Sequence, residues 1–225
     1  ININLIYKWV CANKLCLNVD KTKYTIYSNK RAAIDSQLFI NGLKIERSNC
    51  VKVMGIEIDH KLTFSKHVSK LCSKLAFCGY VISKLNGLTD TKLYLLIYNA
   101  FAKSLLEYGI TLWGSTSKVY LKPLVVLQNS IVRKIYFQRN CYAKTKNIYR
   151  NLNILTINNL YKLNAACFMF KMRNNISSNI LTENLIISNN GSRKSKRFNH
   201  LLTKPAYKLT CCTKNIVWMG PLVYN

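Results

Sequence analysis

VKVMGIEIDHKLTFSKHVSKLCSKLAFCGYVISKL, residues 51–85, is the stretch that decides how this chain folds. Its first eight residues indicate one strand with alternate side chains on opposite faces, and Gly55 marks a bulge or a close backbone approach. After a turn at residues 59–61, apolar residues recur every three or four positions, which is typical of an amphipathic helix over residues 63–86. The stretch therefore joins the end of a sheet domain to a set of helices.

The predicted helix over residues 63–86 has an apolar face and a cationic face. With successive residues about 100° apart, four lysines fall together opposite the apolar stripe, and two aromatic side chains project near them. The apolar stripe includes Phe64, Val68, Leu71 and Leu75, the lysines are Lys66, Lys70, Lys74 and Lys84, and the aromatic residues are Phe77 and Tyr80. Such lysines bind phosphates and such aromatic rings pack on sugars or bases. Contact of the two rings with a neighbouring helix is an equally good explanation.

The chain as a whole is strongly basic. Its 225 residues include 34 Lys and Arg but 8 Asp and Glu, which gives a formal net charge of +26. A globular chain with this imbalance repels itself and is expected to lie against a polyanion. The preference for lysine, asparagine and isoleucine fits an AT-rich coding sequence, but this bias does not neutralise the charge. The charge therefore favours nucleic acid as a partner.

The flanking sequence indicates further elements. We expect a helix over residues 1–13, a strand over 23–28, and a hairpin at Asn41-Gly42 that joins residues 51–58 in a small antiparallel sheet. Residues 91–112 are apolar nearly all round, which is typical of a buried central helix. Pro123, in the next predicted helix, is tolerated only in a first turn. That helix spans 118–139, and further helices are expected near 144–151, 156–174 and 176–188, followed by a basic linker over 189–197.

Cysteine and histidine do not form a recognisable metal or redox motif. The nine cysteines show no C-x-x-C spacing, and neither His60 nor His67 has a cysteine or acid at ligand spacing. An odd number of cysteines and the lack of a signal peptide favour an intracellular, reducing compartment. No uncharged apolar run is long enough to cross a membrane. The chain starts at Ile1 and its first methionine is Met54, so we expect a fragment of a longer protein.

A second informative stretch lies near the start of the chain. It follows the pattern W-h-x-x-N-x-L-x-L-N-x-x-K-T-x-x-h-x-h-F/Y-S without gaps, where h is apolar. The matching residues are Trp9, Asn13, Leu15, Leu17, Asn18, Lys21, Thr22, Tyr27 and Ser28. This pattern and residues 51–71 resemble reverse transcriptases of non-LTR (LINE-type, jockey-like) retrotransposons. Met54 and Phe64 replace the leucine and tryptophan usual in that family.

Three later stretches extend the resemblance over most of the chain. They are SLLEYGITLWG (104–114), LQNSIVRKI (127–135) and the tail TCCTKNIVWMGPLVYN (210–225). The resemblance implies an α+β, mostly α fold, in which a small antiparallel sheet is followed by a helical bundle. It also implies the end of a palm over residues 1–60, a thumb-like bundle over 61–140 and a helical extension over 141–225.

The resemblance also implies a set of functional residues. Lys21 matches the motif D lysine that approaches the phosphates of the incoming nucleotide, although closing a polar turn is an equally good role for it. Lys23, the four helix lysines, Phe77 and Tyr80 would contact an RNA template–DNA primer duplex. The other partner would be the upstream polymerase and endonuclease portion of the same polyprotein, without a membrane. The setting would be a nuclear or cytoplasmic ribonucleoprotein.

The chain lacks the carboxylate pair that polymerisation requires. Polymerases of this kind use two metal ions held by aspartates, and no two acids of this chain are adjacent. The acids are Asp20, Asp35, Glu46, Glu57, Asp59, Asp90, Glu107 and Glu183. Glu57 and Asp59 share one strand face, where a solvated strand end is a better interpretation than a metal site. The family's catalytic aspartates lie upstream, so we expect this chain alone to be inactive and Mg²⁺ to act in the intact polymerase.

Two classes of function stay open. The first is a fragment of an RNA-directed DNA polymerase that contributes template–primer binding. The alternative is a non-enzymatic, basic helical module, a degenerate or domesticated remnant that binds RNA or DNA. A Tyr/Phe-x-Asp-Asp turn encoded upstream of Ile1 would distinguish them. A protein lying on a membrane surface is disfavoured, because the central helices are apolar on every side.

Overall fold

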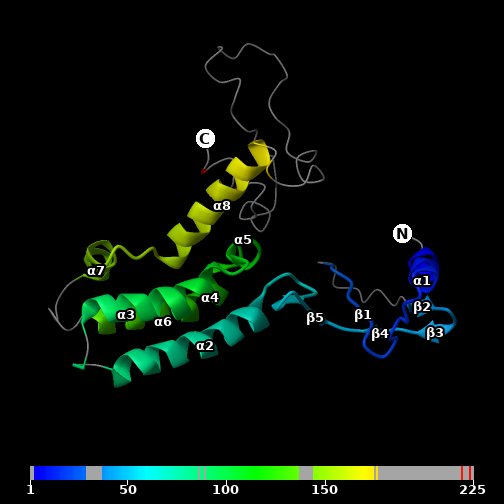
Figure 1. The fold of residues 1–225 in the computed structure, drawn as a ribbon, viewed down its shortest axis with the longest axis horizontal. Helices are drawn as coiled ribbons and strands as arrows, with labels where there is room; N and C mark the ends of the chain where they lie inside the picture. Colours follow the sequence, from blue (N-terminus) through cyan, green and yellow to red (C-terminus); the bar gives the residue numbers. More distant parts are fainter. Residues whose placement is uncertain are drawn as a thin grey trace, which may run out of the picture. The chain divides into compact units, whose positions relative to one another are not determined.

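The computed structural model describes residues 3–28, 37–85, 87–88, 90–136, 144–174, 176, 219 and 223. The chain divides into two compact units, Ile1–His67 and Val68–Asn225. Short strands lie in the first unit and the later part is helical, which confirms the α+β, mostly α prediction (Figure 1). The domain boundaries at residues 60 and 140 stay predictions. The linker over 189–197, nearly all of the helix at 176–188 and nearly all of the tail motif lie outside the described residues.

The first unit begins with helix α1 (Ile3–Ala12), close to the predicted span. The helix ends in a Schellman motif, in which Lys14 is left-handed at φ 57°. The Leu15 amide donates to the Val10 carbonyl at 3.0 Å, and the Lys14 amide donates to the Cys11 carbonyl at 3.0 Å. None of the residues of α1 is buried, and Trp9 is largely exposed.

Six short strands form three separate two-stranded ladders. They are β1 (Lys23–Tyr24) with β4 (Glu46–Arg47), β2 (Phe39–Ile40) with β3 (Leu43–Lys44), and β5 (Cys50–Val53) with β6 (Ile56–Asp59). The hairpin at Asn41-Gly42 is confirmed, with φ of 49° and 77° at its two turn residues. The single antiparallel sheet was wrong, because β1 pairs in parallel with β4 and the other two ladders stay apart. The strand predicted over 23–28 is also shorter, at Lys23–Tyr24.

The strand predicted over 51–58 is in fact a hairpin. Met54 and Gly55 have φ of 46° and 83°, the two positive values that a tight type I′ turn requires. Val53 pairs with Ile56 across this turn, and Cys50 pairs with Asp59 at the open end. Gly55 therefore reverses the chain instead of marking a bulge. Val53 and Ile56 share a face because they pair across the turn, so the alternation changes phase there and the apolar residues move from positions 51 and 53 to positions 56 and 58.

The helices follow in chain order. They are α2 (Ser65–Lys84), α3 (Thr91–Ile97), the π-helix η1 (Tyr98–Lys103), α4 (Ser104–Glu107), α5 (Ile110–Trp113), α6 (Lys118–Tyr136), α7 (Thr145–Asn151) and α8 (Ile157–Arg173). The helices predicted near 144–151 and 156–174 are confirmed. Helix 91–112 is instead four segments, which break at Gly109 in the left-handed region at φ 61°. Complete burial was also wrong there, since Leu93, Leu96 and Phe101 are exposed.

Pro123 lies in the sixth position of α6, and not in its first turn. Proline cannot donate the hydrogen bond that the Val119 carbonyl would receive in a regular helix. Pro123 and Val119 are both exposed, so water can take the place of the missing donor. The prediction that proline must stand in the first turn was wrong because it left out this solvent compensation.

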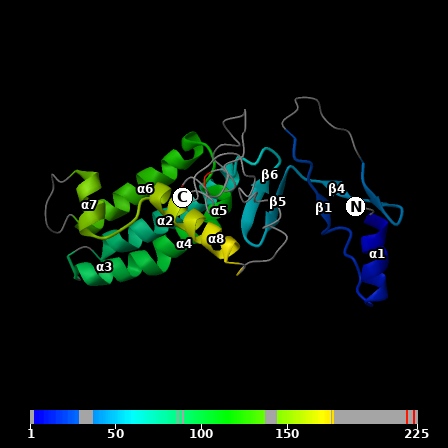
Figure 2. The ribbon, with the colours of Figure 1, turned by 90° about the horizontal axis from the view of Figure 1, so that it is seen from above.

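The core of the second unit lies between α2, α6 and the α3–η1–α4 segment, with α8 packed on α4 and α5. Figures 1 and 2 show α2, α3 and α6 side by side, while α8 crosses them obliquely. Fully buried side chains come from every one of these elements: Leu75, Ile82, Tyr94, Tyr98, Leu106, Ile110, Trp113, Leu124, Ile131, Ile135 and Ile157. The helices therefore form a bundle that holds α2 by one face and leaves its other face to solvent.

Candidate nucleic-acid interface

The chain enters α2 through a turn that Asp59 holds in place. One carboxylate oxygen accepts hydrogen bonds from the amides of Lys61 at 3.0 Å and Thr63 at 2.9 Å, and the other accepts from the Thr63 hydroxyl at 2.8 Å. Leu62 and Phe64 flank Thr63 with φ of 53° and 54°, a left-handed conformation that is strained for large side chains. The carboxylate therefore stabilises an unfavourable backbone path that sets where α2 begins.

Asp59 is 8% exposed, so the solvated strand end predicted for it was wrong. Burial opposes ionisation of its carboxyl group, but the hydrogen bonds from Thr63, Lys61 and Phe64 outweigh burial and lower its pKa. A role as metal ligand has no support from its neighbours. Within the described residues, no group of three or more His, Cys, Asp or Glu side chains is placed to hold a metal ion.

The apolar face of α2 packs into the protein as predicted. Val68, Leu71 and Leu75 are buried on this face, and Phe64 is buried just before the helix begins. Gly79 is also buried, and a Cβ atom there would lie 3.1 Å from Cγ1 of Ile131 on α6. Lys134 of α6 donates from Nζ to the Gly79 carbonyl at 3.2 Å. Close packing and this hydrogen bond hold α2 to α6 at the middle of the bundle.

The opposite face of α2 carries the predicted lysines and aromatic rings. All four lysines are exposed: Lys66, Lys70, Lys74 and Lys84. Phe77 is 67% exposed and Tyr80 is 57% exposed, so no neighbouring helix covers either ring. Lys84 places Nζ 5.6 Å from the centroid of the Tyr80 ring, within the range of a cation–π interaction. The structure thus brings these six side chains together on one helix face, and their binding role stays a prediction.

The two N-terminal lysines lie in a different setting. The Asn18 side chain accepts from the Lys21 amide at 3.0 Å, and the Thr22 hydroxyl donates to the Asn18 carbonyl at 2.7 Å. Asparagine and threonine therefore shape a turn that leaves the Lys21 side chain exposed. Lys23 pairs with Glu46 at 2.9 Å across the β1–β4 ladder. Lys23 therefore has a carboxylate partner, and the Lys21 side chain is exposed at the tip of its turn.

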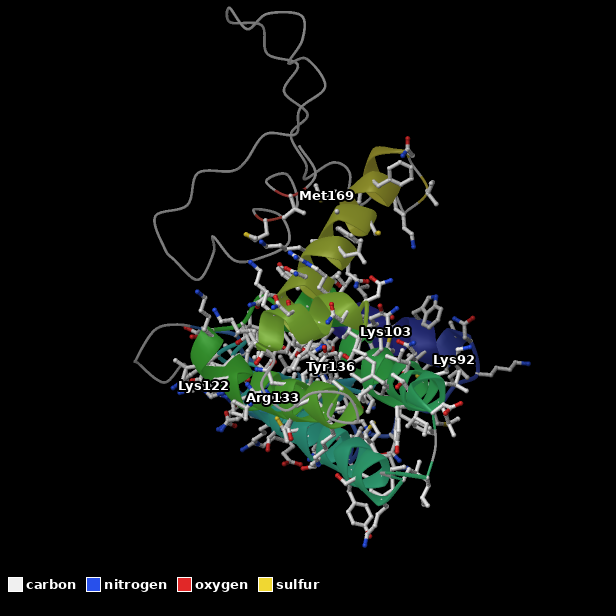
Figure 3. All side chains as sticks on the ribbon, turned by 90° about the vertical axis from the view of Figure 1, so that its left-hand side faces the viewer. Lys92, Lys103, Lys122, Arg133, Tyr136 and Met169 are labelled. Carbon is white, nitrogen blue, oxygen red and sulfur yellow. The ribbon has the colours of Figure 1, made fainter. Side chains whose placement is uncertain are left out.

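Other cations extend around the helical unit. In Figure 3, Lys92 and Lys103 lie to one side of the helices, while Lys122 and Arg133 of α6 lie to the other. Lys103 faces Glu107 at 3.8 Å, and Arg133 donates to the Thr145 hydroxyl at 2.7 Å. The surface is therefore basic on more than one side, and what distinguishes α2 is the combination of lysines with exposed aromatic rings.

A groove beside this face was missed at the level of sequence. It lies between α2 and the α3–η1–α4 segment, has a volume of about 490 Å³, and is lined by Phe77 and Lys74 on one side and Phe101 on the other. Phe101 is 61% exposed. The sequence analysis placed Phe101 in a buried helix. Its four-residue spacing from Ile97 and from Leu105 was the only signal that these three residues share one face.

The later motifs serve packing. Trp113 is fully buried and donates from Nε1 to the Tyr108 carbonyl at 2.9 Å. A Cβ atom on Gly114 would lie 2.5 Å from the Ile110 carbonyl oxygen and 2.7 Å from the Tyr161 ring of α8, so only glycine fits. Residues 104–114 therefore contribute to the packing of the helical unit.

Gln128, in the LQNSIVRKI motif, is a fully buried hydrogen-bonding centre. Its Nε2 donates to the Tyr98 hydroxyl and to the Leu155 carbonyl, both at 2.9 Å, and its Oε1 accepts from the Ile157 amide at 3.2 Å. Burial raises the pKa of Tyr98 to about 12, although the hydrogen bond from Gln128 opposes this shift. One amide group therefore joins α6 to η1 and to the start of α8.

Comparison with known proteins supports the resemblance seen in the sequence. The chain is 25% identical over 187 residues to the RNA-directed DNA polymerase from mobile element jockey of Drosophila melanogaster, which covers 81% of this chain and 20% of that protein. Two further relatives come from Drosophila melanogaster. The chain is 24% identical over 156 residues to the probable RNA-directed DNA polymerase from transposon X-element, a match that covers 67% of this chain and 17% of that protein. It is 24% identical over 208 residues to the probable RNA-directed DNA polymerase from transposon BS, a match that covers 88% of this chain and 22% of that protein.

The chain thus spans about a fifth of the length of the curated relatives it matches. No model of a protein family matches it, and no solved structure does. The similarity to RNA-directed DNA polymerases of non-LTR transposons is therefore confirmed at the level of sequence. None of the helices in the described residues combines the length and apolar character needed to cross a bilayer.

Proposed function

We propose that this chain is part of a non-LTR retrotransposon reverse transcriptase, comprising the end of the palm, the thumb and a helical extension. Its contribution to RNA-directed DNA synthesis would be to hold the template–primer duplex. The observation that carries this proposal is helix α2, which is packed by one face and exposes four lysines and two aromatic rings on the other. The similarity to RNA-directed DNA polymerases supports the choice of nucleic acid.

The dimensions of α2 fit a duplex. Lys66 and Lys84 are 18 residues apart, so at 1.5 Å per residue the lysine face extends for about 27 Å. Nucleotides on one strand are about 3.4 Å apart, so this face spans roughly eight base pairs. Lysine contacts to phosphates give affinity without sequence preference, which a polymerase needs because it must copy any template.

The chemistry of nucleotide addition would come from elsewhere in the intact protein. The described acids do not form a ligand set for Mg²⁺, and both oxygens of Asp59 already accept hydrogen bonds. The family resemblance would place the catalytic aspartates and their Mg²⁺ ions in an upstream part of the polyprotein. The exposed apolar side chains of α1, Leu5, Ile6 and Trp9, would pack against the rest of the palm.

The same proposal covers Lys21 and the cellular setting. Lys21 would approach the phosphates of the incoming nucleotide from the tip of its turn. The cysteines in the described part of the chain are all free thiols, which fits a reducing compartment and a nuclear or cytoplasmic ribonucleoprotein.

The test removes four positive charges from α2 and has a matched control. In the variant Lys66→Gln, Lys70→Gln, Lys74→Gln and Lys84→Gln, we expect weaker binding of a 20-base-pair RNA–DNA hybrid in fluorescence anisotropy. The slope of log affinity against log salt concentration should flatten by about three units, since each phosphate contact contributes roughly 0.7 to 0.9. Thermal stability should change little, because glutamine is a good helix former.

The control removes the same charge from exposed lysines on other helices: Lys92→Gln, Lys118→Gln, Lys122→Gln and Lys162→Gln. We expect this control to keep most of the wild-type affinity and slope. Equal losses in the two variants would show that binding depends on total charge and would overturn the assignment to α2. Wild-type affinity in the α2 variant would overturn the proposed function of this face.

A further inference from the structure

We propose that the groove between α2 and the α3–η1–α4 segment holds unpaired bases of a single-stranded nucleic acid, stacked against Phe77 and Phe101. This inference rests on the proposed function and deepens it. Duplex phosphates would lie along the lysine face of α2, and an adjoining single-stranded segment would place its bases in the groove. All residues of the groove belong to the helical unit.

The groove is a shaped apolar site. Its volume of about 490 Å³ lies within the range of about 300–1,000 Å³ that is usual for small-ligand sites. Phe77, Cys78 and Val81 of α2 form one wall, and Ile97, Phe101 and Leu105 form the other. Phe77 and Phe101 are 67% and 61% exposed, so each offers a ring face instead of filling the core.

The π-helix explains why the second wall exists. In an α-helix, eight residues turn through about 800°, so Ile97 and Leu105 would be about 80° apart around the axis. The hydrogen bonds of a π-helix span five residues, and its wider turn reduces this drift. Residues 97, 101 and 105 therefore stay on the same wall, with η1 at its centre. Single π turns within α-helices occur frequently at functional sites.

Charge decides between a nucleic acid and an apolar protein segment as the occupant. Lys74 lines the groove, Lys70 is exposed one turn earlier on α2, and α2 contains no acidic residue. The one acid on the opposite segment, Glu107, faces Lys103 at 3.8 Å. A strand of nucleic acid supplies phosphates for these lysines and flat rings for the phenylalanines. An apolar helix would supply contacts for the phenylalanines but no phosphates for the lysines.

The lining also defines the specificity of the site. Its polar side chains are Lys74 and Ser73, whose hydroxyl donates to the Ser69 carbonyl, so it offers few groups with which to read base edges. Stacking on aromatic rings tolerates every base, because every base has a π-face. Bases in a duplex are stacked on one another and are not available to the groove. We therefore expect binding of single strands without marked sequence preference, and tighter binding of a hybrid with an overhang than of a blunt one.

The experiment compares a single-stranded 12-mer of deoxythymidine with a blunt 12-base-pair RNA–DNA hybrid in fluorescence anisotropy. For Phe77→Ala with Phe101→Ala, the affinity for the single strand should fall by about 5- to 150-fold for each base that loses its ring. The affinity for the blunt hybrid should fall by much less than that for the single strand, because the lysines bind its phosphates, and the salt slope should not change, because no charge is removed. Phe170→Ala, which removes an exposed ring from α8, is the matched control and should change neither affinity.

A second measurement locates the bases directly. A single strand carrying 5-iodouracil, irradiated in the complex with the wild-type chain, should cross-link to Phe77 or Phe101, as mapped by mass spectrometry. Unchanged single-strand affinity in the double variant, equal losses for single strand and duplex, or cross-links confined to other residues would each overturn the inference. Unchanged single-strand affinity in the double variant would indicate that a protein segment, and not a nucleic acid, occupies the groove.

The two proposals fail in different ways. If the lysine variant loses hybrid binding while the phenylalanine variant keeps its single-strand affinity, the groove assignment fails and the proposed function stands. If the wild-type chain binds neither the hybrid nor the single strand, the proposed function fails first.

Discussion

Asp59 shows how one side chain directs the chain from a sheet into a helix. Its carboxylate accepts hydrogen bonds from the amides of Lys61 and Thr63 and from the Thr63 hydroxyl, in a turn where Leu62 and Phe64 are left-handed. An isolated strand end would leave this carboxylate in water. In the folded protein it is buried and hydrogen-bonded, so it contributes more to stability than its position at the end of a strand indicated.

This leads to a prediction for Asp59→Asn. The amide cannot accept all three hydrogen bonds, so at pH 7 we expect the free energy of unfolding to fall by about 1–3 kcal/mol. The folded pKa of Asp59 is lowered from the unfolded value near 3.9, so its contribution is present above that value and is lost as the pH falls through the folded pKa. The difference between wild type and variant should therefore hold from pH 7 to pH 5 and shrink at pH 3.

Urea denaturation at the three pH values measures this difference. Asp90→Asn is the control, because Asp90 is exposed at the start of α3 and its side chain makes no capping hydrogen bond. A difference at pH 3 as large as at pH 7 would show that the charge of Asp59 is not the source of the effect.

At the scale of elements, the segment from α3 to α4 departs most from its sequence pattern. Tyr94, Tyr98, Ala102 and Leu106 are all buried although they are spaced by four residues throughout. In an α-helix this stripe would rotate by about 120° and leave the core, but η1 reduces the drift. Gln128 of α6 hydrogen-bonds the Tyr98 hydroxyl within η1. The π-helix thus keeps one stripe in the core and another along the groove.

A second prediction concerns how α2 is held. Leu75 is 1% exposed, and Leu75→Ala should lower the free energy of unfolding by about 2–5 kcal/mol, because it leaves a cavity in the core. Leu96→Ala, at an exposed position of α3, is the control and should change stability by less than about 0.5 kcal/mol. Thermal and urea denaturation give both values.

The hybrid affinity of folded Leu75→Ala should match that of the wild type, since the lysine face is not altered. Loss of binding in a sample that circular dichroism shows to be folded would mean that the two faces of α2 are not independent.

At the scale of the whole molecule, the charge of +26 and the exposed apolar surface of the first unit both indicate a chain that works with partners. A polyanion relieves the repulsion among the lysines. The exposed apolar side chains of α1 call for protein contact, because they make up one side of an amphipathic helix with no buried residue. Under the proposed function, nucleic acid would meet the first requirement and the rest of the palm would meet the second.

A third prediction follows for catalysis. The purified chain should incorporate no nucleotide on a primed RNA template with Mg²⁺ and all four deoxynucleotides, because it lacks an adjacent aspartate pair. Primer extension resolved on a denaturing gel measures this. Extension above a no-protein control, retained after the chain is purified to homogeneity, would contradict the prediction.

The sequence by itself determined the features that depend on local pattern. Apolar spacing located α1, α2, α7 and α8. The pair Asn41-Gly42 located a hairpin because both residues tolerate positive φ. Periodicity also placed the lysines and aromatic rings of α2 on one exposed face, and the motif residues carried the resemblance that the polymerase relatives confirm.

The tertiary structure alone decided the features that depend on contacts between distant residues. The ladder of β1 with β4, the burial of Asp59 and the hydrogen bonds of Gln128 each join segments or groups whose meeting no local pattern encodes. The π turn of η1 is of the same kind, because it follows from how the segment packs and not from its residues one by one. The groove with Phe77 and Phe101 exists only where two such helices meet, which is why periodicity along one helix could find half of it.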